Sequence, residues 1–170
     1  MSRLPRPLLA LFAAALLFKL VLIVAFLGRL YPDVIGAVNL GKEALGGLEG
    51  YRITSKTFVG PLLWYGVYHL AGLWGLKLLN LALFAWLLVL HARLGLATFS
   101  TTTVLLASAL FAFYPGTCLN VAVGEQDDLA TLLLFALAVL RWAERRDAFL
   151  PGLLVGLAFL FKFSAAAFAP

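Results

Sequence analysis

Acidic residues form two groups beside long apolar stretches of this chain. Asp33 follows the first apolar stretch, in the sequence Tyr-Pro-Asp-Val, whereas Glu125, Asp127 and Asp128 lie between the third and the fourth. Carboxylates at the edge of a bilayer are costly to remove from water, so their presence needs a reason. A carboxylate can take a proton from a hydroxyl group during a transfer reaction. The two groups are therefore candidates for one reaction site.

Composition shows which class of protein must position these residues. Of the 170 residues, 64% are hydrophobic and 12% are charged, whereas a soluble domain averages about 25% charged residues. We therefore expect an integral membrane protein. The single Cys118 excludes an internal disulfide. The net charge of +5 follows the expected membrane topology and does not indicate nucleic-acid binding.

The hydropathy pattern predicts an all-α polytopic protein with about five spans. Arg3 and Arg6 give the chain a basic start, as in a signal peptide. The apolar stretch that follows reaches the roughly 20 residues needed to cross a bilayer, and no cleavage site precedes a soluble region. We interpret it as a retained signal anchor. The expected spans are 7–28, 72–91, 102–114, 129–142 and 151–169.

Basic residues predict the orientation of the spans. With a cytoplasmic N-terminus, six arginines lie on the inside and four basic residues lie outside, which agrees with the positive-inside rule. The absence of an Asn-x-Ser/Thr sequon disfavours a glycosylated eukaryotic ectodomain, and we expect a bacterial inner membrane. The inside set is Arg3, Arg6, Arg93, Arg141, Arg145 and Arg146, and the outside set is Arg29, Lys42, Arg52 and Lys56.

The long first loop, 29–71, is expected to contain interfacial helices. Its first part, 33–48, is compatible with a helix that glycines then interrupt. Its second part, 58–70, is rich in aromatic residues, which prefer the headgroup level of a membrane, and Pro61 suits a first helical turn. We expect this second helix to lie along the interface instead of crossing. Tyr51 and His69 are further candidates to line a site, although a polar face of an interfacial helix explains His69 more simply.

Several phrases occur in an order that resembles a known family. They are P-D with a helix ending in G-L-E-G-Y-R, then F-V-G-P-L-L-W-Y-G-V-Y-H-L-A-G-L-W-G-L-K-L-L-N, then V-G-E-Q-D-D-L, and finally G-L-L-V-G-L-A-F-L-F-K-F-S-A-A-A-F-A-P. This order resembles the GT-C superfamily of membrane glycosyltransferases over nearly the whole chain. The resemblance implies a sugar donor on polyprenyl phosphate and a reaction at the extracytoplasmic face.

The resemblance implies a role for Asp33. In this superfamily an acidic residue in the first extracytoplasmic loop is the catalytic base, and Asp33 occupies that place. An inverting transfer needs a carboxylate to take the proton of the acceptor hydroxyl as the sugar carbon is attacked. The alternative is that Asp33 caps a helix beginning at Val34, because Asp is a favoured N-cap residue.

Asp127 and Asp128 resemble the second acidic motif of the superfamily, G-x-x-D. That motif lies near the donor phosphate or a bound divalent metal ion, and Asp127 fits its position better. Hard cations prefer carboxylate oxygens, so a metal ion at Asp127 is feasible. The alternative is that both residues cap the fourth span, where the helix dipole favours carboxylates.

Basic residues supply candidates for phosphate binding. Arg52 and Lys56 are the candidates for the donor phosphate, since cations stabilise a charged leaving group. The alternative is that both bind lipid headgroups nonspecifically. Lys77, near the outer end of the second span, can snorkel. Lys162 lies in mid-span and needs a partner or a polar cavity, and Lys19 is equally deep without an assigned role.

These observations lead to one functional hypothesis and two alternatives. We expect residues 1–170 to form a single transmembrane domain, the N-terminal part of a longer GT-C module that is inactive as this fragment. The full enzyme would transfer a mannose-like hexose to a glycan, lipid or protein acceptor. The first alternative is a non-enzymatic transporter or flippase subunit, with charges facing one another in mid-membrane. The second is a structural membrane protein whose acidic residues are all helix caps.

Overall fold

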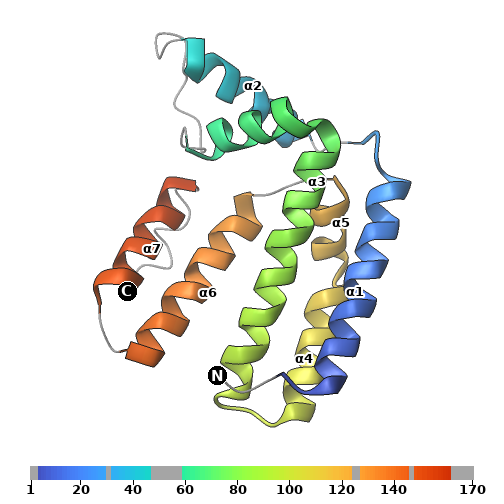
Figure 1. The fold of residues 1–170 in the computed structure, drawn as a ribbon, viewed down its shortest axis with the longest axis vertical. Helices are drawn as coiled ribbons and strands as arrows, with labels where there is room; N and C mark the ends of the chain where they lie inside the picture. Colours follow the sequence, from blue (N-terminus) through green and yellow to red (C-terminus); the bar gives the residue numbers. More distant parts are fainter. Residues whose placement is uncertain (1–3, 30–31, 47–58, 124–126, 146–147, 162–170) are drawn as a thin grey trace.

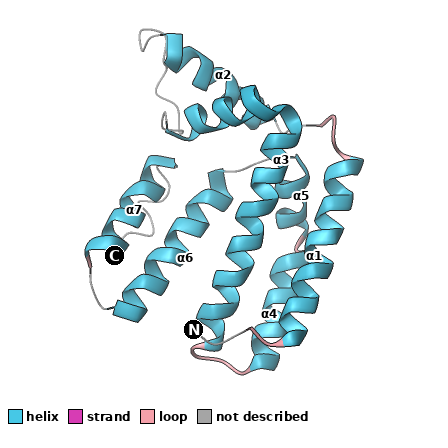
Figure 2. Ribbon diagram, viewed as in Figure 1, coloured by secondary structure: helices cyan, strands magenta, loops and turns pink. Residues whose placement is uncertain are grey.

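The fold is helical throughout the part of the chain that the computed structural model describes, residues 4–29, 32–46, 59–123, 127–145 and 148–161. Figure 2 shows helices and loops in these ranges and no strand. The all-α prediction is therefore confirmed. The helices are α1 Arg6–Ala25, α2 Pro32–Gly46, α3 Val59–Leu96, α4 Thr101–Phe113, α5 Pro115–Val123, α6 Asp127–Arg145 and α7 Phe149–Phe161.

The helices form a bundle that α2 crosses at one end (Figure 1). We call this the far end, because α1 leads to it from the near end, where the chain begins. The long part of α3 returns to the near end, α4 and α5 lead back, and α6 returns once more. The core between these helices is apolar. Its buried members include Leu8, Ile23, Phe84, Leu88, Val104, Ala112, Val121 and Leu133.

Gly72 breaks α3 into an upper segment, residues 59–71, and a long segment, residues 73–96. Its backbone has φ 59° and ψ −152°, a conformation that glycine adopts and other residues avoid. An added Cβ at Gly72 would meet nothing within 4 Å. Backbone conformation, and not crowding, is therefore what requires glycine here. The predicted boundary between an aromatic helix ending near 70 and a span beginning at 72 is confirmed, and Pro61 lies in the first turn of α3 as expected.

The upper segment of α3 packs closely against α2. Buried Val34, Ala37 and Val38 of α2 share an apolar cluster with Trp64. The two helices approach most closely at Gly41, where a Cβ would overlap the Pro61 carbonyl oxygen and lie 2.6 Å from the Cβ of Tyr65. These two helices therefore form one unit across the far end of the bundle.

Fewer helices qualify as membrane spans than the five predicted. Among the described residues, α1 and α3 are long and apolar enough to cross a bilayer, and α4 with Pro115–Ala122 makes a third if this bent pair is one span. The expected fourth span fails because α6 carries charges at both ends, leaving 129–140 too short for the roughly 20 residues required. The described part of the fifth, α7, has 13 residues.

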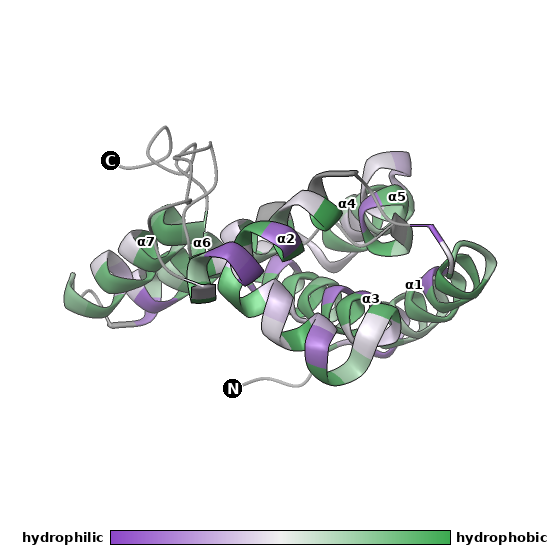
Figure 3. Ribbon diagram, turned by 90° about the horizontal axis from the view of Figure 1, so that it is seen from above, coloured by the Kyte–Doolittle hydropathy of each residue, from purple (hydrophilic) through white to green (hydrophobic). Residues whose placement is uncertain are grey.

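The outward surfaces of the helices are apolar. Figure 3 shows hydrophobic residues over most of the bundle, with hydrophilic residues more frequent on α2. Exposed side chains include Leu17, Val21, Leu106, Leu110 and Trp142. A soluble protein rarely exposes apolar side chains in such numbers. Together with the two apolar helices, this surface indicates a membrane protein.

The helix α5 was not predicted. Its axis bends by 50° from that of α4, and the chain passes from one helix to the other at Tyr114 and Pro115. Proline cannot continue a helix but is well placed at the start of a new one, because an N–H at that position would have no partner within the helix. The expected span at 102–114 therefore corresponds to α4 alone.

The close approach at Gly41 generates a stability prediction. Replacing Gly41 with Ala should lower the free energy of unfolding by about 1–3 kcal/mol, because the new methyl group overlaps the Pro61 carbonyl. Gly36→Ala on the same helix is the matched control, since its Cβ would meet nothing within 4 Å. That control should leave stability unchanged or raise it by up to about 1 kcal/mol. Thermal unfolding in detergent, followed by circular dichroism, compares them, and equal stability of both variants would contradict the packing.

Candidate functional site

Lys77 is buried in the far half of the bundle and bonds to three backbone carbonyls. Its side chain has 0% exposure. The ammonium Nζ donates to the carbonyl oxygens of Phe26, of Arg29 at 2.9 Å, and of Ala122 at 2.7 Å. An ammonium group has three donors, so all three are used. Lys77 therefore has no donor left for a ligand phosphate, and its role is structural.

The carbonyls that Lys77 binds belong to the ends of two helices. Phe26 and Arg29 follow α1, and Ala122 is in the last turn of α5. The last carbonyls of a helix lack partners within it and carry partial negative charge. A cation placed there satisfies both needs. Lys77 could have snorkelled to the interface, but two helix ends provide its partners inside the bundle.

The two acidic groups follow directly from the segments that Lys77 binds. Asp33 is four residues beyond Arg29 and is the second residue of α2, whereas Asp127 is five residues beyond Ala122 and begins α6. Both helices begin at the far end of the bundle (Figure 1). The backbone thus carries the two acidic positions to the same end.

The predicted site residues differ in how far they can be placed. The structure describes the backbone of Asp33, Asp127 and Asp128, but their side chains lie outside the described part of the chain. The predicted phosphate-binding residues Arg52 and Lys56 lie outside the described residues altogether. The same holds for Tyr51, Glu125 and Lys162. Their predicted roles stay predictions.

The helix starts bear on the capping alternatives. Since α2 begins at Pro32, Asp33 lies inside the first turn and does not cap a helix starting at Val34. Asp127 and Asp128 likewise occupy the first turn of α6. Carboxylates in a first turn are stabilised by the helix dipole, by about 0.3–1 kcal/mol each. A structural reason for these acids therefore stands beside the catalytic one.

A polar groove lies between α2 and the upper segment of α3. It has a volume of about 490 Å³ and is lined by Asn39 and Lys42 of α2 and by Tyr65, Tyr68 and His69 of α3. The His69 ring stacks on Tyr65, with ring centroids 5.9 Å apart. At 3.6 residues per turn, position 33 is half a turn around α2 from Lys42. His69 therefore lines a groove, but the groove is on the opposite side of α2 from the position of Asp33.

Lys19 forms a second polar contact inside the bundle, at the break between α4 and α5. Its side chain is fully buried, with Nζ 3.4 Å from both Thr117 Oγ1 and Cys118 Sγ and 4.2 Å from the centroid of the Phe84 ring. Thr117 Oγ1 lies 2.8 Å from the Phe111 carbonyl oxygen, within donating distance. Lys19 thus ties α1 and α3 to the start of α5.

Asn80 adds a further bond between α3 and α5. It is fully buried, and its Nδ2 donates to the Asn120 carbonyl oxygen at 2.6 Å. Asn80 lies one helical turn after Lys77, so the two side chains share a face of α3. Sequence reasoning missed Asn80 and the partners of Lys77 and Lys19. The available signal was the presence of polar side chains inside apolar spans, which need partners.

The described residues supply no cluster of ligands for a metal ion. Within the described ranges, no group of three or more His, Cys, Asp or Glu side chains could hold a metal ion. The side chain of Asp127, the predicted ligand, is not among them. The metal ion predicted at Asp127 therefore stays a prediction.

Comparison with known proteins does not place the chain in a family. No protein family, curated protein or solved structure matches this sequence or its fold. The likeness to GT-C enzymes therefore has only the quoted motifs as its basis.

The bonds of Lys77 predict the effect of removing its charge. Lys77→Met removes three hydrogen bonds, and the Phe26 carbonyl keeps only the one that it accepts from the Arg29 N–H. A lost bond to a charged donor costs about 1.5–3 kcal/mol. We expect a lower melting temperature and more frequent opening of α5 away from the bundle. Cys118, the single cysteine of the chain, reports on α5 directly, so its maleimide reactivity should rise at least about tenfold, a change of about 1.4 kcal/mol in opening free energy.

Lys42→Met is the control for this experiment. It removes the same charge from an exposed position on α2, so Cys118 reactivity should not change. Equal reactivity of Cys118 in wild type and Lys77→Met would show that Lys77 does not hold α5 in place.

Proposed function

We propose that this chain is part of a membrane glycosyltransferase that uses a polyprenyl-phosphate-linked sugar. The hexose, mannose-like by the resemblance, would pass to a glycan, lipid or protein acceptor at the extracytoplasmic face. The proposed location is a bacterial inner membrane with the N-terminus in the cytoplasm, on the basis of the arginine distribution.

The convergence at Lys77 is the observation that supports this proposal most. One ammonium binds the end of α1 and the end of α5, and the first acidic position and the acidic pair follow the bonded residues within six positions. A transferase needs a base and donor-binding groups in one compartment. The arrangement of the backbone is compatible with that requirement, whereas acids at opposite ends of the bundle would not be.

In the proposed reaction Asp33 acts as the general base. Its carboxylate takes the proton of the acceptor hydroxyl while the hydroxyl oxygen forms a bond to the anomeric carbon. The bond from that carbon to the phosphate oxygen breaks, and polyprenyl phosphate leaves with the electron pair. Because phosphate is already a good leaving group, the reaction does not need a dedicated general acid. Arg52 and Lys56 are proposed to stabilise the charge that collects on the phosphate.

The lysine contacts give the transporter alternative little support. A conduction path of fixed charges would place lysines opposite acids in the middle of the membrane. The contacts described for Lys19 are a hydroxyl, a sulfur and an aromatic ring, and those for Lys77 are backbone carbonyls. None of these partners is a carboxylate, and the contacts hold helices together, which is what a fixed scaffold requires.

The proposal predicts that Asp33→Asn blocks sugar transfer. In proteoliposomes containing the full-length protein, the wild type should consume a polyprenyl-phosphate-linked hexose, and Asp33→Asn should lower turnover by at least about 100-fold, the usual contribution of a general base. Asp147→Asn is the control, because Asp147 directly follows Arg146, which is expected on the cytoplasmic side. Wild-type turnover in a correctly inserted Asp33→Asn protein would remove Asp33 from the mechanism.

A further inference from the structure

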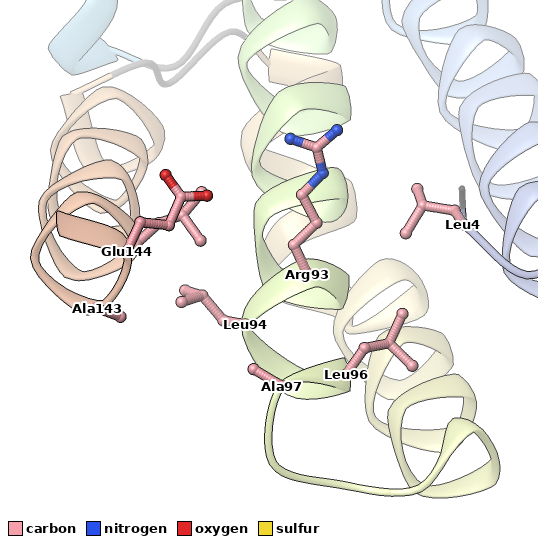
Figure 4. A pocket seen from close by; sticks show the side chains of 8 residues that line it. Leu4, Arg93, Leu94, Leu96, Ala97, Ala143 and Glu144 are labelled. Atoms are coloured by element: carbon pink, nitrogen blue, oxygen red, sulfur yellow. The ribbon is translucent and has the colours of Figure 1, made fainter. Parts of the chain in front are cut away.

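A pocket of about 350 Å³ lies at the near end of the bundle, between the last turns of α3 and α6. Figure 4 shows Arg93 rising from α3 and Glu144 from α6, with Leu4 closing one side. The remaining walls are apolar, formed by Leu94, Leu96, Ala97, Leu140 and Ala143. The volume falls within the usual range for small-molecule sites. The pocket thus combines two opposite charges with apolar walls at the edge of a membrane domain.

Arg93 is the unusual member of this pocket. Its side chain is half-buried and forms no hydrogen bond or ion pair with the described part of the chain. Figure 4 shows it leaning back along α3, away from the loop at Ala97, as side chains on a helix do. The guanidinium is therefore directed back along the bundle and away from its near end. A cation in such a place needs an anionic or polar partner.

Glu144 faces the same pocket but does not pair with Arg93. Its Oε2 accepts a bond from Arg141 Nη1 at 3.3 Å, an exposed contact within one turn of α6. A carboxylate has further acceptor sites beyond this single bond. The pocket therefore offers a cation on the α3 wall and a carboxylate with spare acceptors on the α6 wall.

We propose that this pocket binds the headgroup of a phospholipid that carries both a phosphate and a primary ammonium, such as phosphatidylethanolamine. The phosphate would accept two parallel bonds from the Arg93 guanidinium, whose planar fork matches phosphate oxygens. The ammonium would donate to Glu144. The acyl chains would cover the leucines that line the pocket. This inference is independent of the proposed sugar transfer.

The charges distinguish this lipid from others in the same membrane. An anionic headgroup such as that of phosphatidylglycerol would satisfy Arg93 but carries no ammonium of its own to bond to Glu144. The quaternary ammonium of phosphatidylcholine has no N–H to donate to Glu144. Only the primary ammonium satisfies both walls, and a basic edge that merely attracts anionic lipids would show the opposite preference.

Lipid retention by the purified full-length protein tests the proposal. Native mass spectrometry after exchange into mixed micelles would compare phosphatidylethanolamine, phosphatidylglycerol and phosphatidylcholine at equal concentration. We expect phosphatidylethanolamine to be retained at least about tenfold over both others, equivalent to about 1.4 kcal/mol. Arg93→Gln should weaken its retention by a similar factor. Glu144→Gln should remove the preference for phosphatidylethanolamine over phosphatidylcholine.

Two control variants separate the pocket from the basic membrane edge around it. Arg6→Gln removes an exposed charge at the start of α1, and Asp147→Asn removes an acid close to Glu144 in the sequence. Neither should change lipid preference. Preferred retention of phosphatidylglycerol, an unchanged preference in Glu144→Gln, or a loss as large in Arg6→Gln as in Arg93→Gln would overturn the proposal.

Discussion

A lysine ammonium buried among apolar helices must find three acceptors, and the far half of this bundle is arranged to supply them. Lys77 takes them from the ends of α1 and α5. Leaving an ammonium without partners in such surroundings costs several kcal/mol, so both helix ends are required at that place. Because α2 follows one of these ends and α6 follows the other, the same three bonds restrict where both acidic helix starts lie.

The two breaks in the apolar helices make this arrangement possible. At Gly72 the chain turns from the upper segment of α3 into its long segment, which brings Lys77 to the depth of the helix ends within two turns. At Pro115 the chain leaves α4 and begins α5, which ends next to Lys77. Lys19 and Asn80 bind α5 from α1 and α3. Three buried polar side chains, Lys19, Lys77 and Asn80, thus bind α5, the shortest of the described helices.

Hydropathy alone identifies the all-α class, α1, α4 and the boundary at Gly72, because these follow from apolar length, aromatic position and glycine. It overstates the number of spans, because α6 contains an apolar centre between charged ends and only 13 residues of α7 are described. The helix α5 was missed because Pro115 and Gly116 suggest a turn. The burial of Lys77 depends on carbonyls 45 or more positions away in the sequence, and no local pattern contains that information. The sequence predicts that positions 33 and 127 share one end of the bundle. It does not predict that position 33 lies on the opposite side of α2 from the groove at Lys42, because that depends on how α2 is rotated against α3.

Positions 33 and 127 must open to one compartment if Asp33 and Asp127 are to act in a single site. Single cysteines placed at either position, in a Cys118→Ala background, can be labelled in intact cells with a membrane-impermeant maleimide. The account predicts that both positions react from outside without permeabilisation, whereas a cysteine at position 147 reacts only after it. Labelling of position 33 and position 127 from opposite sides of the membrane would contradict the account.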